Sequence, residues 1–283
     1  MVPRCDQTAG IVMKSAGDAG SAYRFKMMAG AVTLSYGDHC LAEGLVVTLT
    51  TDSGAQITLS PQNGEVAAEA ETLELVSEDL RTTCRLTLES AGASGLLSCD
   101  LTVSQRAFQR DPSLAAEQGI RIQFARLPAA GRWLALYRHK DWWSRPKFGT
   151  ALEQVPARTQ ALSIERVGQH LVLTPIAQGG YTAEIAGLAQ GGICLAISSY
   201  CGGLNTCQAT VLAFGLHEDP FQAIEESVSF AHGKFPGTLP LRQRTWPVMM
   251  DQLGWCSWDA FYHQVNEAGV RAKAAEFVQQ GVP

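Results

Sequence analysis

Residues Cys84-Arg85-Leu86-Thr87-Leu88-Glu89 alternate between apolar and polar side chains, and this pattern decides the fold class of the chain. A period of two places one face of a strand on an apolar core and the other face in water. The same alternation occurs at 45–50 and at 101–104. These segments are therefore predicted to be half-buried β-strands.

Further strand-like segments follow along the first three quarters of the chain, at 119–126, 132–139, 160–164, 170–176, 181–185, 193–200 and 209–215. Glycine-rich turns, such as Gly179-Gly180 and Gly191-Gly192, separate several of them. No helical periodicity lies between these strands. So many short strands at near-regular spacing predict a mainly β protein with a large antiparallel β-sandwich.

The pattern becomes helical at Asp219, which can cap a first helical turn, and Pro220 suits the first helical position. Apolar residues then recur at helical spacing, so a closing helix is predicted at 219–232. We expect an N-terminal sandwich domain at 1–235 that includes this helix. A proline-containing linker at 236–250 follows it.

A second helix is predicted at 267–280, with Asn266 as its N-cap and Gly281 as its C-cap. Together with a strand expected at 253–258, it makes one βα unit within residues 251–283. A single βα unit leaves its sheet edges unpaired, so it is predicted to begin a larger domain.

The composition excludes several classes of partner. The 283 residues carry a formal net charge of -5 and contain no block of Lys or Arg, which argues against nucleic acid and anionic membranes as partners. No apolar run approaches the roughly 18 residues of a membrane span. The eight cysteines form no Cys-x-x-Cys pair, and the first residues, MVPRCDQTAGIVMK, lack the apolar core of a secretory signal. We therefore expect reduced, mostly buried thiols and a cytoplasmic protein.

The chemistry is concentrated in one run, Leu253-Gly254-Trp255-Cys256-Ser257-Trp258-Asp259-Ala260-Phe261-Tyr262. Sugars present apolar C–H faces and a rim of hydroxyls. A sugar site therefore needs aromatic plates beside a fixed hydrogen-bond acceptor. This run supplies both within ten residues.

The chain resembles the N-terminal part of the raffinose synthase and seed imbibition protein family, which is related to the family 36 α-galactosidases. Four segments carry the resemblance: Tyr137-Arg138-His139-Lys140-Asp141-Trp142-Trp143-Ser144-Arg145-Pro146-Lys147-Phe148-Gly149, then Arg158-Thr159-Gln160, then Leu173-Thr174-Pro175-Ile176 with Gly180-Tyr181, and finally 254–262 with Gly269-Val270. The chain departs from the family at Arg158, where a glutamate is usual.

The resemblance implies that the sandwich precedes a catalytic (β/α)₈ barrel and that 253–258 is barrel strand 1, the start of a truncated barrel. Trp258 and Asp259 would then lie at the C-terminal end of that strand, where the active sites of such barrels are built. The family's nucleophile and acid/base are aspartates on later strands, so no catalytic residue is expected in this chain. Because retaining chemistry needs two carboxyl groups about 5–5.5 Å apart, the 283 residues are expected to be inactive alone. Without the other strands, Val270, Phe277 and Val278 should be exposed or buried against the sandwich.

Six residues are candidates for substrate contact: Trp255, Trp258, Asp259, Trp142, Trp143 and Arg145. A structural alternative stands beside them, because Trp255 could pack inside the barrel. Trp142 and Trp143 are adjacent and would face opposite ways on a strand, so only one can line a shared site. The alternative places one of these two in the sandwich core and the other at a domain interface.

The resemblance implies an α-galactosidase-type glycoside hydrolase that acts on α-galactosides by double displacement, with no metal or organic cofactor. One alternative is galactosyl transfer onto sucrose, as in raffinose synthesis. Another is a non-catalytic carbohydrate-binding or domain-packing module. Association into a homo-oligomer is left open.

Overall fold

The computed structural model describes residues 22–61, 70–78, 81–104, 112–235, 237, 239, 241–252 and 254–282. Cys5 and Leu253, which the sequence analysis used, lie outside these residues. The chain divides into two compact units, Met1–Pro236 (unit 1) and Gly237–Pro283 (unit 2). Each unit is described by itself.

Unit 1 is built from strands. They are β1 Tyr23–Met28, β2 Ala31–Tyr36, β3 His39–Thr50, β4 Gln56–Pro61, β5 Thr72–Val76, β6 Thr83–Ala91, β7 Ser94–Thr102, β8 Ile120–Arg126, β9 Trp133–Lys140, β10 Trp143–Gly149, β11 Thr159–Arg166, β12 Gln169–Pro175, β13 Ala177–Gln178, β14 Tyr181–Gly187, β15 Ile193–Ser198 and β16 Thr206–His217. A 3-10 turn, η2 Leu152–Gln154, connects β10 to β11.

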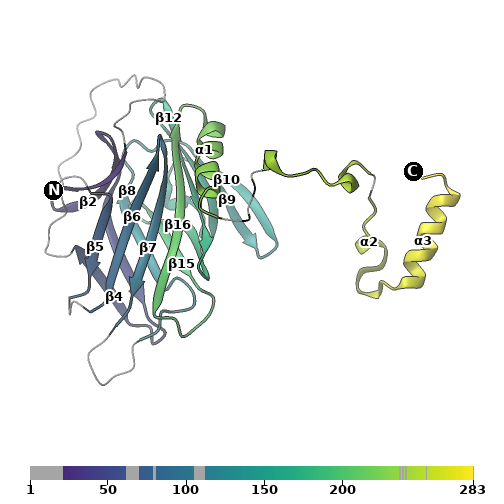
Figure 1. Cartoon of the computed structure of the whole chain (residues 1–283), viewed down its shortest axis with the longest axis horizontal. Coiled ribbons are helices and arrows are strands. Elements are labelled where there is room, and N and C mark those ends of the chain that lie inside the picture. The colour runs from purple at the N-terminus through teal and green to yellow at the C-terminus, as the bar shows by residue number, and fades with distance from the viewer. Residues whose placement is uncertain are drawn as a thin grey trace. The chain divides into compact units, whose positions relative to one another are not determined.

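These strands form one sheet that closes on itself. Among the described residues its order is β10-β9-β11-β12-β16-β7-β6-β5-β4-β3-β8-β15-β14-β13, with β2 joined to β3 and β1 to β2. Neighbouring strands pair antiparallel, and a further pairing of Thr159 with Ile185 joins β11 to β14. In Figure 1, β5, β6, β7 and β16 run side by side in one layer of unit 1. The predicted mainly β, antiparallel architecture is confirmed.

The alternating residues point as the sequence indicated. Cys84, Leu86 and Leu88 of β6 are buried, whereas Arg85 is exposed. They join one apolar core that fills the closed sheet and contains Tyr23 and Phe214, which meet edge-to-face. Residues that alternate with this core, such as Arg85 of β6, therefore lie on the outward face of their strands.

Helix α1 Pro220–His232 covers the outer face of the sheet over β16 and β12 (Figure 1). Asp219 caps it by accepting a hydrogen bond from the Phe221 amide at 2.8 Å, as predicted. The helix presents small buried residues, Ala223, Ser227 and Ala231, to the strands. Gly215 of β16 allows this close approach, because a β-carbon there would lie 2.6 Å from the Ala223 carbonyl oxygen.

Unit 2 contains short helical elements followed by one longer helix: η3 Leu241–Gln243, η4 Val248–Asp251, α2 Trp258–Phe261, η5 Tyr262–Gln264 and α3 Glu267–Gln279. The predicted second helix and its Asn266 cap are confirmed, since the Asn266 side chain accepts from the Gly269 amide at 2.9 Å. At the other end, Gly281 adopts φ +66, and Val282 donates its amide to Phe277. This is the Schellman arrangement that a C-terminal glycine favours.

The strand expected at 253–258 is not formed. Residues 254–257 are irregular, and α2 begins at Trp258. A parallel strand needs neighbouring strands for its backbone hydrogen bonds, and the described residues of unit 2 contain none. The sequence pattern identified a β-prone run, but pairing decides whether such a run becomes a strand.

Exposure in unit 2 follows the expectation in part. Val270 and Val278 are exposed, the latter by 80%. Phe277 is half-buried because Trp255 of the same unit packs against it. No helix among the described residues is long and apolar enough to cross a membrane.

Candidate functional site

The β9–β10 hairpin carries a row of aromatic and basic side chains on one face. Tyr137 and His139 are two residues apart on β9, with ring centroids separated by 6.0 Å. His139 meets Trp143 edge-to-face at 5.6 Å, and the Arg145 guanidinium lies 4.0 Å from the centre of the Trp143 ring. Because Arg145 pairs with Tyr137 across the hairpin, the four side chains make one continuous row. We call it the hairpin row.

Trp142 is not part of the hairpin row. It lies in the turn between the strands and is 82% exposed, with the Lys140 ammonium 5.9 Å from its ring centre. Trp143 is 47% exposed. The alternative that one of these two tryptophans fills the sandwich core is therefore wrong. That place is taken by Trp133, whose indole donates to the Ala151 carbonyl.

A partly buried ion pair involves Arg138, which alternates with Tyr137 and His139 along β9. Arg138 donates to Glu184 at 2.6 Å and to the Tyr200 hydroxyl at 2.9 Å, and the Arg138 and Glu184 side chains are 21% and 11% exposed. The same guanidinium keeps a buried Nε without a described partner. Tyr200 adopts φ +54, a conformation that costs a tyrosine free energy. The contacts of Arg138 with Glu184 and Tyr200 hold the C-terminal end of β9, and the strained backbone of Tyr200 is part of this arrangement.

The turn of the hairpin is tied to β11 by a second ion pair. Arg158, which adopts φ +62, donates to Asp141 at 2.5 Å. This hydrogen bond and the charge of the guanidinium hold the pKa of the Asp141 carboxyl below its usual range. Arg158 is the position where the sequence departs from the family pattern. The structure gives that arginine a local role in holding the turn.

In unit 2, Trp258 belongs to an exposed aromatic cluster. Its ring meets Tyr262 at 5.6 Å and His263 at 5.2 Å, both edge-to-face. Tyr262 has φ +47 and ψ -128, so the backbone is strained where α2 turns into η5. Asp259 follows Trp258 in the first turn of α2 and is exposed. No described residue donates a hydrogen bond to its carboxylate, which leaves the acceptor available to a ligand.

Trp255 lies in a separate cluster. It packs edge-to-face against Phe261 at 6.1 Å and against Phe277 of α3 at 5.5 Å. Phe261 in turn lies so close to Gly269 that a β-carbon there would be 3.2 Å from its ring. Trp255 thus joins the motif to helix α3, whereas Trp258 faces outward beside Asp259.

Among the residues that the structure describes, no group of three or more His, Cys, Asp or Glu could hold a metal ion. The hairpin row and the Trp258 cluster both offer aromatic faces beside charged or polar side chains.

A family model described as "Raffinose synthase or seed imbibition protein Sip1" matches residues 122–283, more than half of the chain. The chain belongs to this family. Both the hairpin row and the Trp258 cluster lie within the matched residues.

Curated relatives match about half of the chain. A galactinol–sucrose galactosyltransferase of Oryza sativa subsp. japonica is 26% identical over 166 residues, which is 54% of this chain and 21% of that protein. A stachyose synthase of Pisum sativum is 26% identical over 153 residues, 53% of this chain and 18% of that protein. The matched region therefore spans about a fifth of the length of these relatives.

Among solved structures, the GH36 alpha-galactosidase AgaB of Geobacillus stearothermophilus is similar, with a TM-score of 0.44 and 13% identity over 84% of this chain and 38% of that one. In this member of the raffinose synthase family, the candidate site residues are identified from the contacts of its own side chains.

Of the six predicted contact residues, the structure brings together Trp143 with Arg145 and Trp258 with Asp259. Within unit 1, Trp142 lies outside the hairpin row, and within unit 2, Trp255 packs in a cluster apart from that of Trp258. Sequence reasoning missed Tyr137 and His139, although their period-two spacing opposite Arg145 could have placed them in the hairpin row. His263, whose ring meets Trp258, was likewise not among the predicted contact residues.

Proposed function

We propose that this chain is the β-sandwich and the first segment of the catalytic barrel of an enzyme that handles α-galactosyl groups. The observation that carries the proposal is the family match, which includes the hairpin row, the linker and the Trp258 cluster. The relatives named above bear galactosyltransferase and stachyose synthase names, which supports galactose as the group that is moved.

Those names favour galactosyl transfer to a sugar acceptor as the reaction. In a double displacement, a carboxylate forms a bond to the anomeric carbon as the bond to the leaving group breaks and an acid/base group protonates that leaving group. An acceptor hydroxyl then attacks the same carbon as its bond to the carboxylate breaks, and the proton of the hydroxyl passes back to the acid/base group. Hydrolysis of an α-galactoside follows the same two steps with water as the acceptor. It is the second candidate, because nothing in the described residues selects the acceptor.

In this proposal Trp258 supplies an aromatic plate and Asp259 a carboxylate acceptor for galactosyl hydroxyls. Trp143 and Arg145 supply a second plate and a fork of donors. Trp255 has the structural role that its contacts with Phe261 and Phe277 indicate. We further propose that the segment after the linker begins a (β/α)₈ barrel and that residues 1–283 alone do not turn over substrate.

The test is an assay of the complete protein. It is incubated with galactinol and sucrose, and separately with an aryl α-galactoside in water, and the products are separated by chromatography. Formation of raffinose supports transfer. Release of free galactose alone supports hydrolysis. Binding of these sugars without either product would favour the non-catalytic module and contradict the enzyme.

Two further properties are proposed from the burial and exposure of side chains. The seven cysteines within the described residues are free, with Cys84, Cys99, Cys194 and Cys207 buried, which supports a reducing compartment such as the cytoplasm. The exposed Val278 and Trp258 support association with further protein surface, either in the same enzyme or in a second copy.

A further inference from the structure

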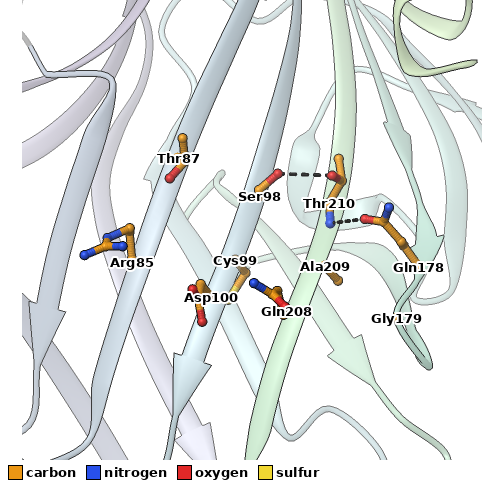
Figure 2. A pocket seen from close by; sticks show the side chains of 10 residues that line it. All are labelled: Arg85, Thr87, Ser98, Cys99, Asp100, Gln178, Gly179, Gln208, Ala209 and Thr210. Atoms are coloured by element: carbon orange, nitrogen blue, oxygen red, sulfur yellow. Dashed lines mark hydrogen bonds between the residues drawn. The ribbon is translucent and has the colours of Figure 1, made fainter. Parts of the chain in front are cut away.

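A polar groove lies on the outer face of unit 1, away from the hairpin row in sequence and on different strands. Figure 2 shows lining residues from β6, β7 and β16, with Gln178 and Gly179 of the β13–β14 turn beside them. Strand pairing sets them in two transverse rungs of three, the first made by Arg85, Asp100 and Gln208 and the second by Thr87, Ser98 and Thr210.

The two rungs differ in depth. Arg85, Asp100 and Gln208 are exposed, whereas the three hydroxyl residues beside them are half-buried. Ser98 and Thr210 hydrogen-bond to each other at 3.1 Å. A ligand would therefore reach the long planar side chains first and the short hydroxyls behind them.

The β13–β14 turn walls the groove on the β16 side. A bulge between Thr210 and Leu212 interrupts the pairing of β16, and the Thr210 amide donates to the side-chain oxygen of Gln178 at 2.6 Å. Gly179 approaches so closely that a β-carbon there would lie 2.5 Å from the Gln208 carbonyl oxygen. Gln178 and Gly179 thus hold the turn against β16. The open groove has a volume of about 500 Å³, within the ~300–1,000 Å³ of small-molecule sites.

The lining selects a class of ligand. The guanidinium of Arg85 already bonds Glu74 at 2.5 Å, and the Asp100 carboxylate stands opposite Arg85. Two carboxylates around one guanidinium disfavour an anion. The six rung side chains include no aromatic ring, and their apolar surface consists of threonine methyl groups and the stems of Arg85 and Gln208, so a large apolar ligand gains little. Arginine donors, a carboxylate acceptor, an amide and hydroxyls together complement a molecule whose neighbouring hydroxyls both donate and accept.

We propose that this polar groove is a binding site for neutral polyhydroxylated molecules, that is, for a sugar or cyclitol unit, separate from the galactosyl site proposed above. Hydrogen bonds exchanged with water contribute little net affinity, and no aromatic plate adds to them. The dissociation constant is therefore expected to be on the order of 1 mM.

The experiment is a titration of the ¹⁵N-labelled 283-residue chain with sucrose, methyl α-galactoside or myo-inositol, followed by backbone amide shifts. Glucose 6-phosphate is the anionic comparator. The amides of 98–100 and 208–210 should shift saturably with at least one neutral probe. Asp100→Ala and Gln208→Ala should each weaken that binding roughly 5-fold or more. Gln160→Ala, an exposed strand glutamine outside the groove, should leave it unchanged. Asp100→Asn replaces the alanine variant if thermal unfolding shows that the alanine disturbs the fold.

Three outcomes would overturn the proposal. The first is no saturable shift at these amides with any neutral probe, and the second is tighter binding of glucose 6-phosphate than of the neutral probes. The third is binding that Gln208→Ala and the Asp100 variants leave intact. In the first outcome, shifts confined to the hairpin row or to residues 254–264 would support the separate galactosyl site. Failure of the groove therefore does not decide the fate of the proposed enzyme.

Discussion

Trp255 lies edge-on to Phe277, with ring centroids 5.5 Å apart, and this contact attaches the aromatic motif of unit 2 to helix α3. The helix has only 13 residues, a length at which an isolated helix is marginal in water. Its persistence is therefore expected to depend on the few side chains that pack on it.

The first prediction separates the two tryptophans of the motif. Trp255→Ala should speed hydrogen exchange of the α3 amides roughly 2- to 10-fold, since an aromatic contact contributes about 0.5–1.5 kcal/mol. Trp258→Ala removes a ring of the same size that does not touch α3 and serves as the control. Equal exchange rates in the two variants would show that Trp255 does not hold the helix.

The second prediction concerns Asp259 in the complete enzyme. Asp259→Asn keeps the shape and loses the charge of the acceptor. A charge-assisted hydrogen bond contributes about 1.5–3 kcal/mol, so kcat/KM on an aryl α-galactoside should fall roughly 10- to 150-fold. Asp251→Asn is the matched control, because an asparagine oxygen can still accept the hydrogen bond from Trp246. A change of less than about twofold for Asp259→Asn would exclude sugar contact.

The third prediction uses the two adjacent tryptophans of the hairpin. Trp143→Ala in the complete protein removes the ring on which Arg145 lies and should weaken binding of an α-galactoside roughly 3-fold or more. Trp142→Ala should leave the affinity unchanged, because that ring lies outside the hairpin row. Isothermal titration calorimetry gives both values. The reverse result would mean that the turn, and not the row, contacts the sugar.

The fourth prediction follows from the ion pair at the hairpin turn. Arg158 lowers the pKa of the Asp141 carboxyl, so the folded chain favours the charged form of Asp141 more than the unfolded chain does. Any stabilisation is present above the pKa of the unfolded chain and is lost as pH falls through the folded value. In an NMR titration, Arg158→Gln should raise the pKa of Asp141. An unchanged midpoint would show that the pair does not persist in solution.

The fifth prediction concerns the seat of helix α1. Gly215→Ala places a methyl group 2.6 Å from the Ala223 carbonyl oxygen, and such overpacking costs about 1–3 kcal/mol of unfolding free energy. Gly202→Ala meets nothing within 4 Å and provides the control. Urea denaturation of both variants measures the difference. Equal stability would mean that α1 moves aside freely.

The sequence predicted unit 1 well because its signals are local. Alternation in β6 and the Asp219–Pro220 helix start each need only neighbouring residues. It did not predict that β10 follows β9 as a strand, because Pro146 and the exposed Phe148 interrupt the usual pattern. It predicted a strand at 253–258 that is absent, since pairing partners are not a property of the run itself. The sequence also could not predict the groove. Its six rung residues come from three strands and become neighbours only through the register of strand pairing.

The bulge in β16 divides that strand into halves with different freedom to vary. Before it, Thr206 and Gln208 face solvent, and only the opposite side, with Cys207 and Ala209, is constrained by the core. After it, residues 212–216 are buried on both sides, because α1 covers the outer one. Selection can therefore change the outward chemistry of the first half, residue by residue, without loosening the helix. In the second half, the side chains on the outer side must remain small because α1 packs on them.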